Sequence, residues 1–206
     1  GKNYEEPGSD PASIWASGNA GVVTISTANV TPLLITGSDK AARLVTKDLG
    51  TLGQLVGQRM GAGSIFTGKF ELDIANPLNS TKFGIPFSAK PVSFSVEYTY
   101  QPGTPYRNNR GQELSKPDSC DIYLILENRE QANPRRVATA WFRSPAAVSS
   151  FQRITVPLVY GALPSSAPAY SIPANGLYGD ANLKVTHLTW VAASSASGAL
   201  FEGGTN

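Results

Sequence analysis

The sequence is poor in the residues that most often build enzyme centres and metal sites. It contains one cysteine, Cys120, and one histidine, His187. A single cysteine forms no internal disulfide, and it excludes Cys-x-x-Cys zinc sites and thioredoxin-type redox motifs. A Ser-His-Asp triad would need His187, and the sequence has no Gly-x-Ser-x-Gly nucleophile elbow. We therefore expect Cys120 to be a small buried residue and His187 to be an ordinary strand residue.

Charged side chains and long apolar runs are also scarce. Charged residues make up 16% of the chain, and the formal net charge is +2. Because there is no basic tract, the composition does not indicate a nucleic acid partner. The adjacent Arg135 and Arg136 are typical of an ordinary exposed pair. No apolar run approaches the ~18 residues of a membrane-spanning helix, so we expect no membrane span.

Turn-forming residues are abundant, with 20 glycines and 15 prolines, and 41% of the chain is hydrophobic. This composition is typical of a folded, turn-rich domain with few helices. A chain of 206 residues is long enough to bury roughly 70% of its unfolded surface in one core. We expect residues 1–13, which are polar and broken by Pro and Gly, to be a linker or lead-in segment, and residues 14–206 to be a single β-sandwich domain.

Hydrophobic alternation with period two is clearest over residues 66–74, where Phe66, Phe70 and Leu72 share one parity and Lys69 and Glu71 the other. This pattern predicts a long central strand with one buried and one solvated face. Further strands are expected at residues 22–25, 33–35, 41–46, 92–100, 119–128, 136–143, 152–160 and 183–193.

The segments between these strands read as turns and loops. Residues 48–60 have helix-like spacing interrupted by glycines, which predicts an irregular connection with a helical turn. Residues 101–117 form a polar loop long enough to be functional or mobile, and residues 161–182 form a second long loop. Many short strands with almost no helix predict an all-β, antiparallel β-sandwich of the jelly-roll type, the architecture shared by carbohydrate-binding modules and galactose-binding-like domains.

A family resemblance rests on the central segment. The run Ala62-Gly-Ser-Ile-Phe-Thr-Gly-Lys-Phe-Glu-Leu72, followed by Gly84-Ile-Pro-Phe87, resembles the family called the putative carbohydrate metabolism domain. Further matches lie at Tyr98-Thr-Tyr100, Cys120-Asp-Ile-Tyr123 and Phe201-Glu-Gly-Gly204, so the resemblance extends from about Trp15 to the end. It implies a secreted or cell-surface domain of a gut bacterium, on the outer face of the cell.

The family pattern continues after residues 201–204 into one more strand, which this sequence lacks. A sandwich without that strand would leave an edge of unpaired backbone groups. We expect this edge to be covered by another segment of the chain, by a neighbouring molecule or by further residues of the natural protein.

The alternation also predicts a polar face on which side chains for ligand binding gather. The candidate ligand-binding residues are Trp141, Tyr123, Glu97, Asp121 and Arg143. Aromatic rings accept the C–H faces of sugars, and charged side chains bond to sugar hydroxyls, so this mixture is typical of carbohydrate recognition. An ordinary solvated sheet face would show the same alternation.

The carboxylates on this face keep a glycoside-active enzyme as an alternative. Glycosidases use two carboxyl groups ~5–5.5 Å or ~6.5–9.5 Å apart, and adjacent strands ~4.8 Å apart could supply them. Glu71, Glu97 and Asp121 are the candidates. We expect no cofactor and no metal centre, although Asp39 or Asp48 could contribute oxygens to a structural calcium ion of the kind found in jelly-roll modules.

The leading hypothesis is a non-catalytic carbohydrate-recognition or cell-surface adhesion module. Its expected partners are a polysaccharide or glycan and the other domains of a parent surface protein. Two alternatives are a glycoside-active enzyme and a structural spacer domain.

Overall fold

The fold is built on one large antiparallel sheet. The computed structural model describes residues 4–8, 13–73 and 75–206. The strand order of the sheet is β1 (Trp15–Ser17), β6 (Ser64–Phe70), β15 (His187–Ala193), β11 (Cys120–Asn128), β12 (Arg135–Ser144) and β14 (Val159–Tyr160). Two short strands extend it, β7 (Thr81–Phe83) beside β6 and β8 (Ile85–Pro86) beside β15.

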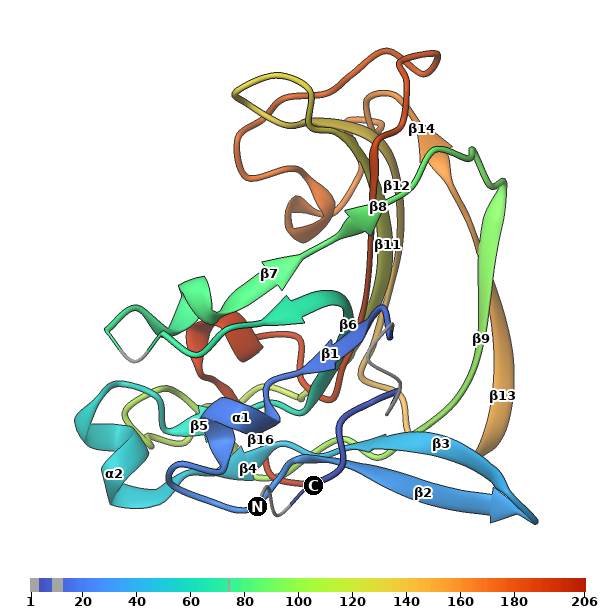
Figure 1. The fold of residues 1–206 in the computed structure, drawn as a ribbon. Coiled ribbons are helices and arrows are strands. Elements are labelled where there is room, and N and C mark those ends of the chain that lie inside the picture. The colour runs from blue at the N-terminus through green and yellow to red at the C-terminus, as the bar shows by residue number, and fades with distance from the viewer. Residues whose placement is uncertain (1–3, 9–12, 74) are drawn as a thin grey trace.

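A two-stranded ribbon of β9 (Ser93–Tyr100) and β13 (Val148–Pro157) forms the second layer. Figure 1 shows this ribbon standing opposite β11 and β12. The core lies between the two layers, where Phe94 of β9 packs with Ile122, Leu124 and Leu126 of β11. The Tyr98 and Phe142 rings meet edge to face across this gap, with centroids 5.5 Å apart. We call the face of the large sheet that points away from the ribbon the outer face.

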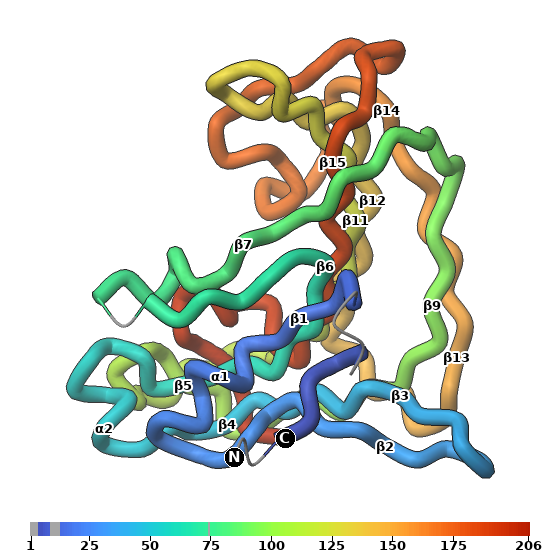
Figure 2. The backbone as a smooth tube through the Cα atoms, in the orientation of Figure 1, coloured from blue at the N-terminus to red at the C-terminus, as the bar shows by residue number. Residues whose placement is uncertain are grey.

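Smaller elements lie at the end of the sandwich where β1 ends and β6 begins. A hairpin of β2 (Val30–Thr36) and β3 (Asp39–Leu44) projects at the lower right of Figures 1 and 2. The remaining pairs are β4 (Lys47–Asp48) with β5 (Met60–Gly61), and β10 (Tyr106–Arg107) with β16 (Gly203–Gly204). The helices are short: α1 (Asn19–Val22), α2 (Gly50–Leu55), η1 (Pro77–Ser80), η2 (Ala169–Ser171) and η3 (Gly198–Leu200).

The all-β prediction is confirmed, and most expected strands are present within a few residues of their predicted bounds. The helical turn expected in residues 48–60 is α2. Cys120 is buried and free, and His187 lies in β15 with its Nδ1 2.9 Å from Thr186 Oγ1. No helix among the described residues is long and apolar enough to cross a membrane. The jelly-roll connectivity and the covered edge near the chain end stay predictions.

Two strand predictions are wrong. Residues 22–25 are the end of α1 and a turn, because the buried Asn19 side chain bonds to the backbone of Asn29 and Val30 and holds the chain in a compact loop. The central strand ends at Phe70 and does not reach Ile74, which lies outside the described residues. Past β6, the Glu71 N–H still bonds to the Ser80 carbonyl, but the Asp73 N–H bonds to the Ser80 side-chain Oγ instead of to a strand partner.

The prediction that Phe66, Phe70 and Leu72 lie on a buried core face is also wrong for β6. Phe66 pairs with Val191, and Val191 pairs with Tyr123, so Phe66 lies on the outer face while Ile122 lies on the inner one. Phe66 is nevertheless buried, against Phe83 of β7 at a centroid distance of 5.1 Å. Leu72 is 46% exposed. Both faces of the large sheet are therefore covered in places, and burial alone does not reveal which face a residue occupies.

Candidate functional site

Four of the five predicted ligand-binding residues lie together on the outer face. The register of β11 and β12 pairs Asp121 with Arg143 and Tyr123 with Trp141. Because Ile122 and Leu124 point into the core, their sequence neighbours point to the outer face. The alternation of β11 and the antiparallel ladder are sufficient to bring these four side chains together.

Asp121 organises the polar half of this group. Its Oδ1 accepts hydrogen bonds from Trp141 Nε1 at 2.5 Å and from Arg143 Nε at 3.1 Å, and its Oδ2 accepts one from Arg143 Nη2 at 2.8 Å. Asp121 is only 5% exposed. Burial raises its pKa, and the bonds from Arg143 and Trp141 oppose that rise without cancelling it. The carboxylate is therefore engaged in positioning its two neighbours.

The aromatic half is a series of three rings that ends at the surface. The Tyr123 and Trp141 rings stack with centroids 4.0 Å apart and planes 20° apart. The third ring is Tyr170 of η2, whose centroid lies 5.7 Å from that of Trp141. The Arg143 guanidinium carbon lies 3.8 Å from the centroid of the Tyr170 ring. Tyr170 is 41% exposed, whereas Tyr123 and Trp141 are half-buried. We call Asp121, Tyr123, Trp141, Arg143 and Tyr170 the outer-face cluster.

The loop of residues 161–182 places Tyr170 in this cluster. Backbone bonds from Arg136 N to the Leu177 carbonyl (3.0 Å) and from Gly179 N to the Arg136 carbonyl (2.9 Å) attach the loop to β12. Ser171 Oγ bonds to the Pro168 carbonyl at 2.7 Å and closes the η2 turn. Tyr170 was not predicted as a site residue, since a loop has no hydrophobic period; the only signal was the length of the loop.

The structure does not bring Glu97 together with the other four candidates. Glu97 pairs with Arg153 across the β9–β13 ribbon, with 2.9 Å between Oε1 and Nη2, and both side chains are more than half exposed. Its neighbour Val96 packs against the core, so Glu97 points away from the sandwich on the ribbon side. Glu97 and Asp121 thus lie on the two opposite surfaces of the sandwich and cannot act on one glycosidic bond. Glu71 is exposed, just beyond the end of β6.

The two aspartates considered for calcium differ in their surroundings. Asp39 is exposed in β3. Asp48 faces two guanidiniums, with Arg59 Nε 2.6 Å from Oδ1 and Arg107 Nη1 3.6 Å from Oδ2. A cation at Asp48 would compete with both. Within the part of the chain that the structure describes, no three His, Cys, Asp or Glu residues are grouped as metal ligands.

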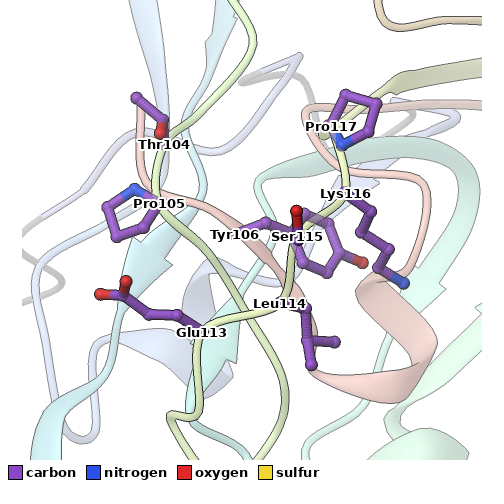
Figure 3. A pocket seen from close by; sticks show the side chains of 8 residues that line it. All are labelled: Thr104, Pro105, Tyr106, Glu113, Leu114, Ser115, Lys116 and Pro117. Carbon is purple, nitrogen blue, oxygen red and sulfur yellow. The ribbon is translucent and has the colours of Figure 1, made fainter.

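A second candidate site is an open pocket on the loop of residues 101–117, shown in Figure 3. Its volume is about 380 Å³, within the range of small-molecule sites. Lys116 Nζ lies 4.4 Å from the Tyr106 ring centre and 3.3 Å from Glu202 Oε2, and Glu113 pairs with Arg107 at 2.9 Å. Each of these charges has an opposite charge beside it. The sequence predicted, from length alone, that this loop is functional or mobile.

Two solved structures from Bacteroides align with this chain. A solved structure from Bacteroides thetaiotaomicron, described as a putative glycoside hydrolase, aligns with a TM-score of 0.78 and 26% identity. The alignment covers 100% of this chain and 64% of that one, so this chain spans less than two thirds of its relative. A second structure, from Bacteroides vulgatus and described in the same words, aligns with a TM-score of 0.73 over 98% of this chain and 84% of that one. At 23% identity this second likeness is one of fold.

The comparison with curated proteins found no match. The family comparison covers the whole sequence, because residues 2–206 match the family described as the putative carbohydrate metabolism domain. The resemblance first seen in the run from Ala62 to Leu72 thus extends to the ends of the sandwich. The protein has a carbohydrate-related role, and the chain belongs to the putative carbohydrate metabolism domain family.

Proposed function

We propose that this domain is a non-catalytic carbohydrate-recognition module whose glycan contact is the exposed ring of Tyr170 with Arg143 beside it. The observation that carries the proposal is the series Tyr123, Trp141, Tyr170, in which two supported rings lead to an exposed third. A sugar ring can lie on the exposed part of Tyr170 while its hydroxyls bond to the guanidinium. Sites of this kind combine an apolar platform with a few placed polar groups.

The positions of the carboxylates favour binding over hydrolysis. Asp121 is buried and bonded to two donors, and Glu97 is paired with Arg153 on the other side of the sandwich. A glycosidase needs two carboxyl groups flanking one bond. Glycoside hydrolysis is kept as the competing function because the two solved relatives are described as putative glycoside hydrolases.

We also propose that the domain works at the bacterial cell surface, joined to other domains of a parent protein. This part rests on the family resemblance and on the greater length of the relative from Bacteroides thetaiotaomicron. In that setting the module would hold the parent protein on a polysaccharide. A structural spacer domain would bind no glycan.

A glycan array followed by calorimetry on the glycans retained tests the proposal. Tyr170→Ala should weaken binding by ~1–2 kcal/mol, the scale of one aromatic contact. Phe151→Ala is the matched control, because Phe151 is also an exposed ring (45%) but lies on β13. Lys116→Ala tests the loop pocket instead. Binding lost in Lys116→Ala and kept in Tyr170→Ala would move the site to that pocket, and no binding to any glycan would refute the proposal.

Reducing-sugar release separates the two functions. We expect no release from a broad panel of polysaccharides by the wild-type protein. Sugar release by the wild type that is lost in Asp121→Asn would show that the domain is an enzyme and not a binding module.

A further inference from the structure

Arg136, at the start of β12, is a buried cation without an acidic partner. It lies on the outer face, where it pairs in register with Glu127, and it is 8% exposed. Within the described part of the chain, no carboxylate forms an ion pair with its guanidinium. The expectation that Arg135 and Arg136 are an ordinary exposed pair is therefore wrong for Arg136, because the loop of residues 161–182 covers it.

The contacts of this guanidinium are few and long. Nη1 donates to Thr139 Oγ1 at 3.3 Å and to the Ser171 carbonyl at 3.4 Å, and both acceptors are neutral. Nε is buried and has no partner. Burial also lowers the pKa of Arg136, and the charge of Glu127 opposes that fall without cancelling it. A buried charge of this kind is costly unless it is paired.

The acidic side chains nearby are taken by other cations. Glu127, opposite Arg136 in the ladder, binds Arg129 at 2.7 Å, and Asp121 binds Arg143 at 2.8 Å. Arg143 bonds to both carboxylate oxygens of Asp121 through Nε and Nη2. Arg129 bonds through the same two nitrogens to one oxygen of Glu127, Oε2. Arg136 has the same kind of guanidinium fork, and the Glu127 carboxylate opposite it acts on its charge without forming an ion pair or hydrogen bond with it.

The position of Arg136 connects it to the outer-face cluster. The Ser171 carbonyl accepts the hydrogen bond from Arg136 Nη1, and Ser171 directly follows Tyr170 in η2. A ligand lying on Tyr170 therefore contacts the same η2 turn whose Ser171 carbonyl bonds to the guanidinium. Nε and Nη2 point to the same side of the guanidinium and form the fork that an anion can engage with two parallel N–H···O bonds, so Nη1 can keep its bond to the Ser171 carbonyl.

We propose that the glycan bound at the outer-face cluster is acidic, and that Arg136 receives its carboxylate or sulfate group. A planar guanidinium matches either anion with two parallel N–H···O bonds, which a neutral hydroxyl cannot supply. The inference rests on the proposed function for its site and deepens it by naming the ligand class. The competing explanation is that Arg136 only fastens the loop through Ser171.

The first test uses small anions and needs no glycan. Sodium glucuronate and sodium sulfate are titrated against sodium chloride at equal ionic strength, with the melting temperature as readout. Saturable binding should raise the melting temperature of the wild type by about 2–4 °C beyond chloride. Arg136→Gln should lose this increment, and the control Arg153→Gln, on the exposed ribbon, should keep it. The comparison between variants removes the general stabilisation by sulfate.

Arg136→Lys keeps the experiment decisive if Arg136→Gln does not fold. Lysine keeps the charge without the fork, so the anion-dependent increment should shrink while the protein melts cooperatively. An increment of equal size in the wild type and in either Arg136 variant would overturn the assignment and leave Arg136 as a loop fastener.

The second test separates the inference from the proposed function. Binding is measured for a neutral oligosaccharide, its uronic acid counterpart and its sulfated counterpart. The favoured acidic form should bind about tenfold tighter or more than the neutral one, and Arg136→Gln should abolish the difference. The stronger of the two acidic arms identifies the carboxylate or the sulfate as the natural group. Equal affinity for neutral and acidic forms would overturn the inference and keep the module. Absence of all glycan binding would refute the module, and the anion titration would still decide what Arg136 binds.

Discussion

The Trp141 indole Nε1 donates a hydrogen bond to Asp121 Oδ1 on the neighbouring strand. The bond is diagonal, because Trp141 pairs in register with Tyr123 and Asp121 pairs with Arg143. This bond fixes the plane of the indole, and the fixed indole stacks on Tyr123. Trp141, a candidate ligand-binding residue from the sequence, therefore supports its neighbours. The exposed contact is the ring it holds in place, Tyr170.

Trp141→Ala should lower stability as well as binding. The substitution removes a half-buried ring, its stack on Tyr123 and the donor to Asp121, which together are worth ~2–3 kcal/mol. For a domain of this size that corresponds to a melting temperature lower by roughly 4–12 °C. Thermal unfolding measures it, with Trp141→Phe, which keeps a ring, as the milder control. An unchanged melting temperature would mean that the indole is free for a ligand.

Asp121→Asn should cost less stability at neutral pH than the loss of a fully buried ion pair, because burial disfavours the charged form of Asp121 more than Arg143 and Trp141 favour it. Burial raises the pKa of Asp121 above its ordinary value of 3.8. The stability that this raised pKa contributes is fully present below pH 3.8 and is lost as the pH rises through the folded pKa. Urea unfolding from pH 3 to 7 should therefore show the advantage of the wild type over Asp121→Asn shrinking as the pH rises. An advantage that grows over that range would contradict the direction of the shift.

Glu97→Gln should change little. The Glu97–Arg153 pair is more than half exposed on both sides, and such pairs contribute about 0–1 kcal/mol. We expect an unchanged melting temperature within a few degrees and unchanged glycan affinity. A loss of affinity would bring the ribbon surface into the binding site, contrary to its position on the other side of the sandwich.

Asp118→Ala should loosen the end of the chain. Asp118 is 1% exposed and accepts bonds from Ser195 Oγ at 2.7 Å and from the Gly204 N–H at 2.8 Å. Removing the carboxylate leaves the Gly204 N–H without its acceptor, at ~1–3 kcal/mol, while Ser195 Oγ keeps the Glu202 carbonyl at 3.2 Å. Hydrogen exchange should become faster at Gly204, in the β10–β16 pair beside the loop pocket, before the core of β11 is affected. Equal exchange rates in the two proteins would show that β16 is held by other contacts.

Within single strands, the sequence was informative about the site. The alternation in residues 119–128 and 136–143 correctly put Asp121, Tyr123, Trp141 and Arg143 on faces away from the core, because side-chain direction alternates with a period of two whatever the strand pairs with. The all-β class followed from the same local patterns, and the family from the run at Ala62 to Leu72.

Which strands share a face was decided by the tertiary structure. Glu97 alternates as regularly as Asp121, yet it lies on the opposite surface, and Phe66 alternates like Ile122 but points the other way. Parity within a strand carries no information on the layer or the register into which that strand is placed. Tyr170 and the burial of Arg136 come from a loop attached to β12 by backbone bonds, and such bonds can form with almost any side chains. The ring that reaches the surface and the buried guanidinium bonded to the same η2 turn are therefore products of long-range packing.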